Sequence, residues 1–493
     1  MRSTVLFTHS YFYKFDPKQW RFKQPYPPLA TLLAAAVMRE NGFDVSLFDV
    51  CLKDGPAEIK NHIAKNPRYV VIYDDGFNYL TKMCLTNMRE AAFEMASLAK
   101  KNGSIVIINS SDSTDHYQKY LDRGVDYVVR GEGEEGLKEL LLTLESGGDP
   151  SGLHGVAFRK NNEVIVTPAR AVMRDLDSLP LPAWDLVDID SYRNIWIEHH
   201  GYFSLNLATT RGCPYKCNWC AKPIYGNRYN SRSPKHVVNE IEKLLTQYKP
   251  THFWMCDDIF SLKPGWAQEF RDEVKRRNLN FRFKIQSRVD LLLEEDNLQA
   301  LADAGVETIW VGAESGSQKI LDAMDKGTTT DQIYNATKLM KQKGIRVAFF
   351  LQFGYLGETK EDIDATLKMV LDLMPDEVGI SVSYPLPGTK FYDKVKDQLH
   401  EKQNWSDSDD LAMMFKSTFN TAYYKELHRY VHSIYRKHKG FNSLKKLFRE
   451  PMRLSYTDIR SGLATFYYIP TAFTQRLRLK QLEKKEAEAE NRK

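Results

Sequence analysis

The chain has 493 residues, of which 42% are hydrophobic and 27% charged, and its net charge at pH 7 is +5. This length is enough for two or three domains with separate cores, and the composition is that of an ordinary globular protein. So small a net charge gives no reason to expect nucleic-acid binding, and no stretch approaches the eighteen consecutive apolar residues of a membrane span.

Short apolar runs alternate with helical patterns over residues 1–150, and the first fifteen residues lack the apolar core of a signal peptide. Strands are expected at 3–8, 45–50, 68–73, 104–109 and 126–129, with helices at 29–37, 79–101 and 135–144. This alternation predicts a doubly wound parallel sheet of Rossmann-like, flavodoxin type, whose ligands lie at the carboxyl ends of the strands. The loops after Thr8, Tyr73 and Asn109 are therefore the ones expected to bind a ligand, although no G-x-G-x-x-G fingerprint follows a strand.

Residues 151–195 are expected to form a linker. Gly155 to Pro168 has the pattern of a β-hairpin that turns at Asn161 and Asn162. The Pro-rich stretch 176–186 is typical of a domain boundary.

A second series of strands and helices follows over residues 196–420. Its six strands are expected at 205–209, 252–256, 281–285, 305–311, 346–351 and 377–383. Each is followed by a helical pattern, and Ser233 with Pro234 begins the first of these helices as N-cap and N1. Polar and glycine residues gather after the strands, which predicts the active face of a βα-barrel.

Three of the six cysteines lie in the loop after the first of these strands. Cys213, Cys217 and Cys220 are spaced C-x₃-C-x₂-C, and closely spaced thiolates bind Fe–S clusters. A zinc site would usually need a fourth protein ligand, which is not obvious here, whereas three ligands on a 4Fe–4S cluster leave one iron open. Three buried cysteines or a zinc knuckle are the alternatives. The six cysteines do not make a disulfide framework, and thiolates held for a cluster fit the reducing cytoplasm, where we expect the protein.

C-x₃-C-x-aromatic-C resembles the radical S-adenosylmethionine (SAM) superfamily. The six strand–helix units match the partial, TIM-like (βα)6 barrel that this resemblance implies. The resemblance implies that the three cysteines bind three irons of a 4Fe–4S cluster and that SAM chelates the fourth. It also implies that an electron, supplied by a reduced ferredoxin or flavodoxin, cleaves SAM to methionine and a 5′-deoxyadenosyl radical. Trp219 takes the place of the aromatic residue beside the adenine.

The first domain, with its Val128 to Glu134 stretch (VVRGEGE), looks like the cobalamin-binding domain of one radical SAM subfamily. That subfamily includes the anaerobic magnesium-protoporphyrin IX monomethyl ester cyclases and many cobalamin-dependent methyltransferases, and residues 218–228 look like its cyclase branch. Two departures matter: the cobalt-ligating Asp-x-His-x-x-Gly motif is missing, and residues 110–114 replace a common Gly-Pro-His sequence. The hydroxyls of 110–114 either bind a corrin amide or cap the next helix, and a scaffold without cobalamin is the alternative for the domain.

The same resemblance implies roles for polar residues at the strand ends. Asp257 and Asp258 occupy the position of the segment that binds the amino group of SAM; which one binds is open, and a capping pair is the alternative. Arg288 is a candidate for the SAM carboxylate, because Arg forms bidentate pairs with carboxylates, or it is an ordinary surface residue. Glu314 and Ser315 resemble the segment that contacts the polar groups of SAM, and a structural salt bridge is the alternative for Glu314. The stretch from Gln352 to Gly354 would lie beside the adenine.

Residues 421–493 are expected to form a helical extension that covers the barrel, with membrane-surface contact as the alternative, and residues 475–493 to form a solvated, partly disordered tail. The sequence therefore predicts an α/β enzyme with a 4Fe–4S cluster, SAM and cobalamin that methylates or oxidatively cyclises a small molecule. A cobalamin-independent radical SAM enzyme with a degenerate first domain and a non-catalytic Fe–S or corrin sensor are the alternatives.

Overall fold

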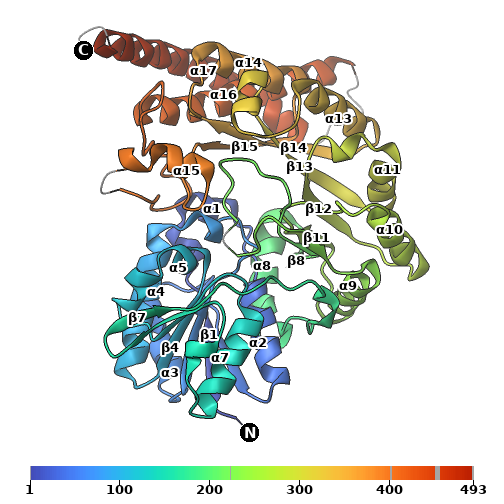
Figure 1. Cartoon of the computed structure of the whole chain (residues 1–493). Coiled ribbons are helices and arrows are strands. Elements are labelled where there is room, and N and C mark those ends of the chain that lie inside the picture. The colour runs from blue at the N-terminus through green and yellow to red at the C-terminus, as the bar shows by residue number, and fades with distance from the viewer. Residues whose placement is uncertain (1, 223, 400–401, 450–455, 491–493) are drawn as a thin grey trace.

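The computed structural model describes residues 2–222, 224–399, 402–449 and 456–490. Its first sheet contains the parallel strands β1 (Thr4–Thr8), β2 (Asp44–Phe48), β3 (Tyr69–Tyr73), β4 (Ile105–Asn109) and β5 (Tyr127–Val129). Their order, β2-β1-β3-β4-β5, is the flavodoxin-type order with its switch point between β1 and β3. The predicted doubly wound sheet is confirmed, and it forms the lower half of the molecule in Figure 1.

Both faces of the inner strands β1, β3 and β4 are buried, which explains why these strands are apolar runs. Val5, Phe7 and Val71 face the helices α2 (Leu29–Glu40) and α7 (Glu134–Glu145), whereas Val70 and Ile72 face α4 (Thr86–Lys101). Successive side chains point to opposite faces of a strand, so each short run contributes to both cores.

The predicted hairpin is present as β6 (Val156–Lys160) and β7 (Glu163–Val166), with its turn at Asn161 and Asn162. It extends the first sheet, because β6 pairs antiparallel with β5. One expectation for this region is wrong. The helix expected from residue 79 begins only at Thr86. Residues 79–85 instead form a loop with the 3₁₀ turn η3 (Thr81–Met83), in which the Thr81 hydroxyl donates to the carbonyls of Asp75 and Asn78.

The second sheet has six parallel strands that neighbour one another in chain order. They are β8 (Ser204–Leu207), β11 (His252–Met255), β12 (Arg282–Ser287), β13 (Val306–Glu314), β14 (Arg346–Phe353) and β15 (Glu377–Val382). The helices that connect them are α9 (Pro234–Tyr248), α10 (Trp266–Arg276), α11 (Glu295–Ala304), α12 (Gln318–Ala323), α13 (Thr330–Gln342) and α14 (Lys360–Leu373). Ser233 caps α9 as predicted, since its side chain accepts the His236 N–H. The half-barrel expected from the sequence is confirmed.

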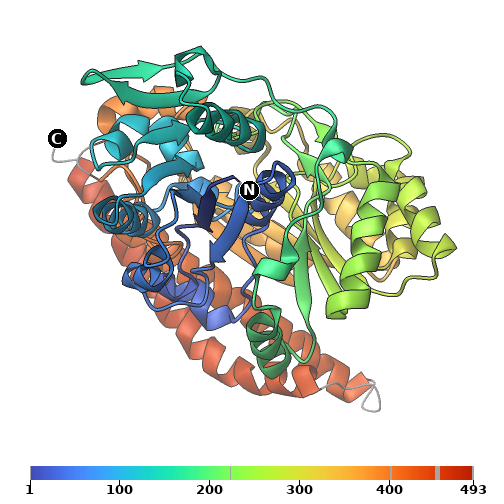
Figure 2. The same ribbon diagram turned by 90° about the horizontal axis from the view of Figure 1, so that it is seen from below.

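The last part of the chain is a pair of long helices, α16 (Thr421–Arg449) and α17 (Tyr456–Glu490). They run along the outer side of the molecule in Figures 1 and 2. Tyr435 of α16 donates to the carbonyls of Pro375 and Asp376, which anchors the pair beside the last barrel strand. The expectation of a partly disordered tail is wrong for residues 475–490, which are helical. Within the described residues, no helix is long and apolar enough to cross a membrane.

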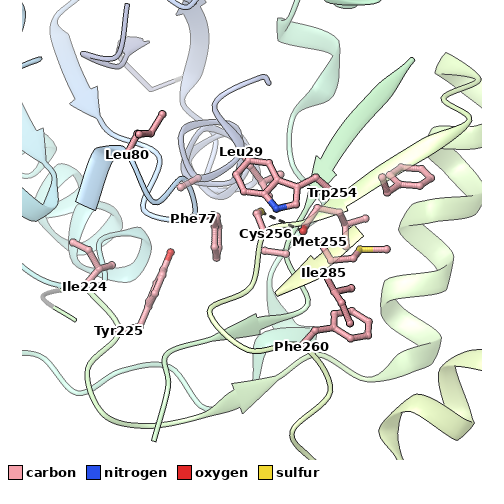
Figure 3. Close-up of a cluster of buried hydrophobic side chains, with 14 of the residues drawn as sticks. Leu29, Phe77, Leu80, Ile224, Tyr225, Trp254, Met255, Cys256, Phe260 and Ile285 are labelled. Carbon is pink, nitrogen blue, oxygen red and sulfur yellow. Dashed lines mark hydrogen bonds between the residues drawn. The ribbon is translucent and has the colours of Figure 1, made fainter. Parts of the chain in front are cut away.

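The first sheet and the half-barrel meet through a shared apolar cluster (Figure 3). Phe77, from the loop after β3, stacks on Tyr225 at a centroid separation of 5.5 Å. Trp254, Met255 and Cys256 at the end of β11 complete the barrel side of this cluster. The carboxyl ends of both sheets therefore face one another across a buried contact.

Candidate functional site

The three clustered cysteines lie in a loop that a short ribbon closes. β9 (Thr210–Arg211) precedes the loop and pairs antiparallel with β10 (Asn230–Ser231), which follows it. Gly212 at the start of the loop has φ +77°, and a Cβ there would lie 2.2 Å from the Arg228 carbonyl oxygen, so this position requires glycine. The ribbon thus sets the entry and exit of the loop beside the end of β8.

All six cysteines are free, but they fall into two groups. Cys213, Cys217 and Cys220 are partly exposed, whereas the other three cysteines are buried. Burial raises the pKa of Cys213 and that of Cys220, the latter to about 11, and the nearby Asp258 carboxylate raises both further. A bound metal centre would reverse this effect, because coordination deprotonates a thiol.

Asn218, between two of these cysteines, attaches the loop to the barrel. Its amide donates to the Ala323 carbonyl at 2.7 Å and its side-chain carbonyl accepts the Tyr355 hydroxyl at 2.5 Å. Its backbone N–H and C=O bond the Met324 carbonyl and the Phe391 N–H. Sequence reasoning missed this residue, and an amide inside the cysteine motif was the only available signal.

Trp219, the aromatic residue of the motif, packs against a buried cluster that includes Ile320, Tyr355 and Phe391. Its indole Nε1 is buried and has no hydrogen-bond partner in the described part of the chain. A buried indole N–H usually finds an acceptor, so this atom fits a ligand with an acceptor beside the loop.

Asp257 and Asp258, the two predicted acids after β11, have different surroundings. Asp257 accepts from the N–H groups of Thr209 and Thr210 at 2.7 and 2.6 Å, and from the Thr209 hydroxyl at 2.8 Å. Burial raises its pKa to about 6 against these hydrogen bonds. Asp257 therefore holds the backbone that leads into the cysteine loop, and both of its oxygens accept hydrogen bonds from that backbone and from Thr209.

Asp258, by contrast, faces the cysteines and pairs with Lys82 of the first domain at 2.5 Å. Burial opposes the charge on Lys82, but the Asp258 carboxylate outweighs it and raises the pKa of the amine. Lys82 also lies within electrostatic range of Cys220. A cation from the first domain thus reaches the cysteine loop, which the sequence did not suggest.

Glu314 is the last residue of β13 and forms a buried ion pair with Lys326 at 2.7 Å. Its φ is +57°, and the pairing of β13 with β14 shifts register between Gly312 and Glu314. Left-handed backbone in a residue other than glycine is costly and concentrates at functional sites. Lys326 lies near Cys217, so this pair belongs to the same site, although the salt bridge named as the alternative for Glu314 is present.

Arg288 does not present a free guanidinium. It bonds Asp290 at 3.0 Å and the carbonyls of Lys326 and Gly327 at 3.0 and 3.3 Å. Its guanidinium also lies 3.6 Å from the ring centroid of Tyr215 in the cysteine loop. Arg288 therefore supports the cysteine loop through its contact with Tyr215. The alternative of an ordinary surface residue is wrong, because Arg288 is buried.

The other predicted residues support the strand ends. The Ser315 hydroxyl lies 3.1 Å from that of Thr366 and accepts the Ser317 N–H, and Gln352 donates to Ser383 at 3.0 Å. Gly354 has φ +76°, and a Cβ there would lie 2.9 Å from Met413. Its N–H donates to Glu358 at 2.6 Å. The structure thus gathers Trp219, Asp258 and Glu314 near the cysteines and gives internal partners to Ser315 and Gln352.

An ion-pair cluster joins the first domain to the residue before Gly212. Arg211 donates to Glu132, in the turn after β5, and, at 2.8 Å, to Glu134, the first residue of α7. All three side chains are buried, with Arg211 only 4% exposed. Burial keeps the pKa of Glu132 above its usual value, although Arg211 lowers it. The Gly-Glu-Gly-Glu stretch therefore fixes the first domain against the cysteine loop.

The strand ends of the first domain are mostly satisfied by their own chain. The backbone N–H and hydroxyl of Ser10 donate to Asp74 at 2.7 and 2.9 Å, and Ser110 and Ser113 form a capping box. Two hydroxyls in these loops, Tyr11 Oη and Ser111 Oγ, are buried and unpartnered among the residues described. Ser110 and Ser113 therefore cap the helix that follows β4. Among the described residues 110–114, only Ser111 has a buried hydroxyl without a hydrogen-bond partner.

Residues 207–370 match the model of the radical SAM superfamily, so this part of the chain is a radical SAM domain. An uncharacterized methyltransferase of Pyrococcus horikoshii is 28% identical over 387 residues, which cover 77% of this chain and 81% of the relative. An anaerobic magnesium-protoporphyrin IX monomethyl ester cyclase of Rubrivivax gelatinosus is 29% identical over 313 residues, or 61% of this chain and 56% of the relative.

Among solved structures, the radical SAM methyltransferase TsrM of Kitasatospora setae, with cobalamin and a [4Fe-4S] cluster bound, superposes with a TM-score of 0.67. The match covers 81% of this chain and 75% of the TsrM chain at 21% sequence identity, so the two proteins share a fold. The domain match and the relatives indicate that the chain is an enzyme, and a radical SAM domain implies a 4Fe–4S cluster and SAM.

Proposed function

We propose that the chain is a cobalamin-dependent radical SAM enzyme that methylates or oxidatively cyclises a small molecule. The observation that carries the proposal is the convergence of three free, partly exposed cysteines with Asp258, Glu314 and the unpartnered indole N–H of Trp219. These groups come from the ends of different strands of one half-barrel, the usual layout of an active face.

The residues fit a cluster and SAM. Three thiol ligands suit a 4Fe–4S cluster with one open iron, and the Trp219 N–H suits an acceptor of the adenine. Asp258 is a suitable acceptor for the SAM ammonium, because its other oxygen is not used by Lys82. When bound, the cluster supplies the electron for reductive cleavage of SAM.

The chain's own residues position the cysteine loop and place charges beside it. Asp257, Asn218 and Arg288 hold the cysteine loop in place at three points along the chain. Lys82 lies near Cys220 and Lys326 near Cys217, and two cations there would favour the more negative, reduced form of a bound cluster.

The test is electron paramagnetic resonance of the anaerobically reconstituted, dithionite-reduced protein. We expect about four irons per chain and a reduced-cluster spectrum that shifts when SAM is added, because SAM would bind the open iron. The triple variant C213A/C217A/C220A is the control and should bind no cluster. An unchanged spectrum with SAM present in excess would refute the proposed site.

Cobalamin is proposed to bind between the strand ends of the first sheet and the barrel. Support comes from the flavodoxin-type strand order and the two buried, unpartnered hydroxyls of Tyr11 and Ser111. When bound, cobalamin would supply a methyl group or act as a redox partner. The capping box of Ser110 and Ser113 and the Ser10–Asp74 pair favour the second candidate, in which the first domain is a scaffold.

Corrin retention separates these candidates. The full-length protein is mixed with hydroxocobalamin without oxygen and desalted, and its visible spectrum is recorded. Near-stoichiometric corrin, reduced several-fold in Ser111→Ala, is the expected result. No retained corrin in the wild type would leave a cobalamin-independent radical SAM enzyme. We further propose a flavodoxin or ferredoxin as electron donor and a cytoplasmic location, since the cluster needs a reducing environment.

A further inference from the structure

The long helix α17 has one face that nothing in the described chain covers. Its opposite face packs on α16 through small residues: a Cβ on Gly440 would lie 1.8 Å from the Thr465 hydroxyl, and one on Gly462 would lie 3.0 Å from Leu444. Thr465, Ala472 and Leu479 are buried on that side. Such close packing fixes the rotation of α17 about its own axis, and therefore fixes which side chains point outward.

The outward face is apolar. Its residues follow a 4-3-4-3-4 spacing that keeps them on one stripe of a helix: Ile459, Leu463, Phe466, Pro470, Phe473 and Leu477. Leu463, Phe466 and Phe473 are 66%, 69% and 62% exposed. Tyr467 and Ile469 border the stripe and are exposed as well. Of the twelve large, exposed apolar side chains among the described residues, seven belong to α17, so the stripe is a surface and not scattered exposure.

The carboxyl-terminal part of the chain that carries this stripe is positively charged. Residues 421–493 contain seventeen Lys and Arg against seven Asp and Glu, a net charge of +10, whereas residues 1–420 carry −5. On α17 itself, Arg460, Arg476, Arg478 and Lys480 are exposed beside the apolar residues. Two copies of this helix packed along their stripes would bring these cations together in either orientation. An anionic surface would instead attract these cations.

We propose that α17 docks the enzyme on the surface of an anionic lipid bilayer. The helix lies in the plane of the interface, with the stripe from Ile459 to Leu477 in contact with the acyl chains and the basic residues among the headgroups. The stripe is about 27 Å long at 1.5 Å per residue. An exposed apolar face that carries Phe, Leu and Ile between Arg and Lys is the pattern of an interfacial helix. The inference rests on this surface alone and is independent of the chemistry at the cysteine loop.

Flotation of the full-length protein with lipid vesicles tests the proposal. We expect it to bind vesicles of phosphatidylcholine mixed with phosphatidylglycerol, to bind pure phosphatidylcholine weakly, and to dissociate at high salt. The variant L463S/F466S/F473S should bind at least about tenfold more weakly, since each side chain loses apolar contact with lipid. Its melting temperature should stay at the wild-type value, because these side chains point away from α16. The variant F22S/I197S is the matched control, because both residues are exposed apolar side chains elsewhere, and it should bind like the wild type.

Two kinds of result would overturn the proposal. One is a wild-type protein that does not float with anionic vesicles, or a stripe variant that floats as well as the wild type. The other is a wild-type dimer in solution that L463S/F466S/F473S converts to a monomer, which would assign the stripe to a second copy of the chain.

Discussion

Removal of the Arg211 guanidinium should uncouple the first domain from the cysteine loop. Arg211 is buried between Glu132 and Glu134, and its guanidinium also lies over the rings of Tyr225 and Phe77, at 5.2 and 5.6 Å from their centroids. Arg211→Met keeps much of the apolar volume but leaves two carboxylates buried without a cation. Breaking a buried ion pair in this way costs about 3–5 kcal/mol.

Thermal unfolding of the purified protein measures this cost. At about 2–4 °C per kcal/mol for a unit of this size, the first transition should fall by about 6–20 °C. The neutral variant R211M/E132Q/E134Q should regain at least half of the loss, because it no longer buries unpaired charge. Arg211→Met should also bind less iron on reconstitution, since Arg211 precedes the loop directly.

Two outcomes would refute this reasoning. If the free energy of unfolding of Arg211→Met lies within about 1 kcal/mol of the wild-type value, the three charges are not buried together in solution. If R211M/E132Q/E134Q is as unstable as Arg211→Met, the cost comes from lost packing and not from unpaired carboxylates.

Three further predictions concern single residues. Asp257→Asn should lower the melting temperature and the iron content, because an amide cannot accept all three hydrogen bonds from Thr209 and Thr210. Asp258→Asn should keep the wild-type melting temperature and iron content but weaken SAM binding at least about tenfold. Trp219→Phe should weaken SAM binding about fivefold in equilibrium dialysis, the effect of one hydrogen bond, and equal affinity would show that the indole N–H does not contact SAM. Burial raises the pKa of Glu358 to about 8, above its value in the unfolded chain, so this group stabilises the fold at low pH and that stability is lost as pH rises toward 8. Glu358→Gln should therefore flatten the decline of melting temperature between about pH 4.5 and 8, and an unchanged profile would contradict the assignment.

The periodicity of the sequence predicted both sheets, because buried parallel strands are short apolar runs and each is followed by an amphipathic helix. It could not predict where the hairpin 156–166 attaches, since strand pairing with β5 depends on a partner distant in sequence. The start of α4 was also wrong. The expected helix included Leu80 and Leu85, but both are buried in the loop that precedes Thr86.

The candidate site was predicted only as far as the cysteine motif and the strand ends. Which of the two adjacent acids faces the cysteines depends on the backbone of Thr209 and Thr210, which takes up Asp257. Arg288 was expected to bind a ligand but is engaged by Asp290 and two carbonyls. Lys82 was not foreseen because it comes from the other domain. These outcomes depend on tertiary contacts, which no local pattern encodes.

The measurement that tests the account most directly is SAM cleavage by the reconstituted, reduced protein. Anaerobic incubation with SAM and dithionite, followed by chromatography, should yield 5′-deoxyadenosine in the wild type and none in C213A/C217A/C220A. Product in equal amounts from both proteins, or from neither although the wild type holds its cluster, would contradict the proposal that this loop is the site of a radical SAM enzyme.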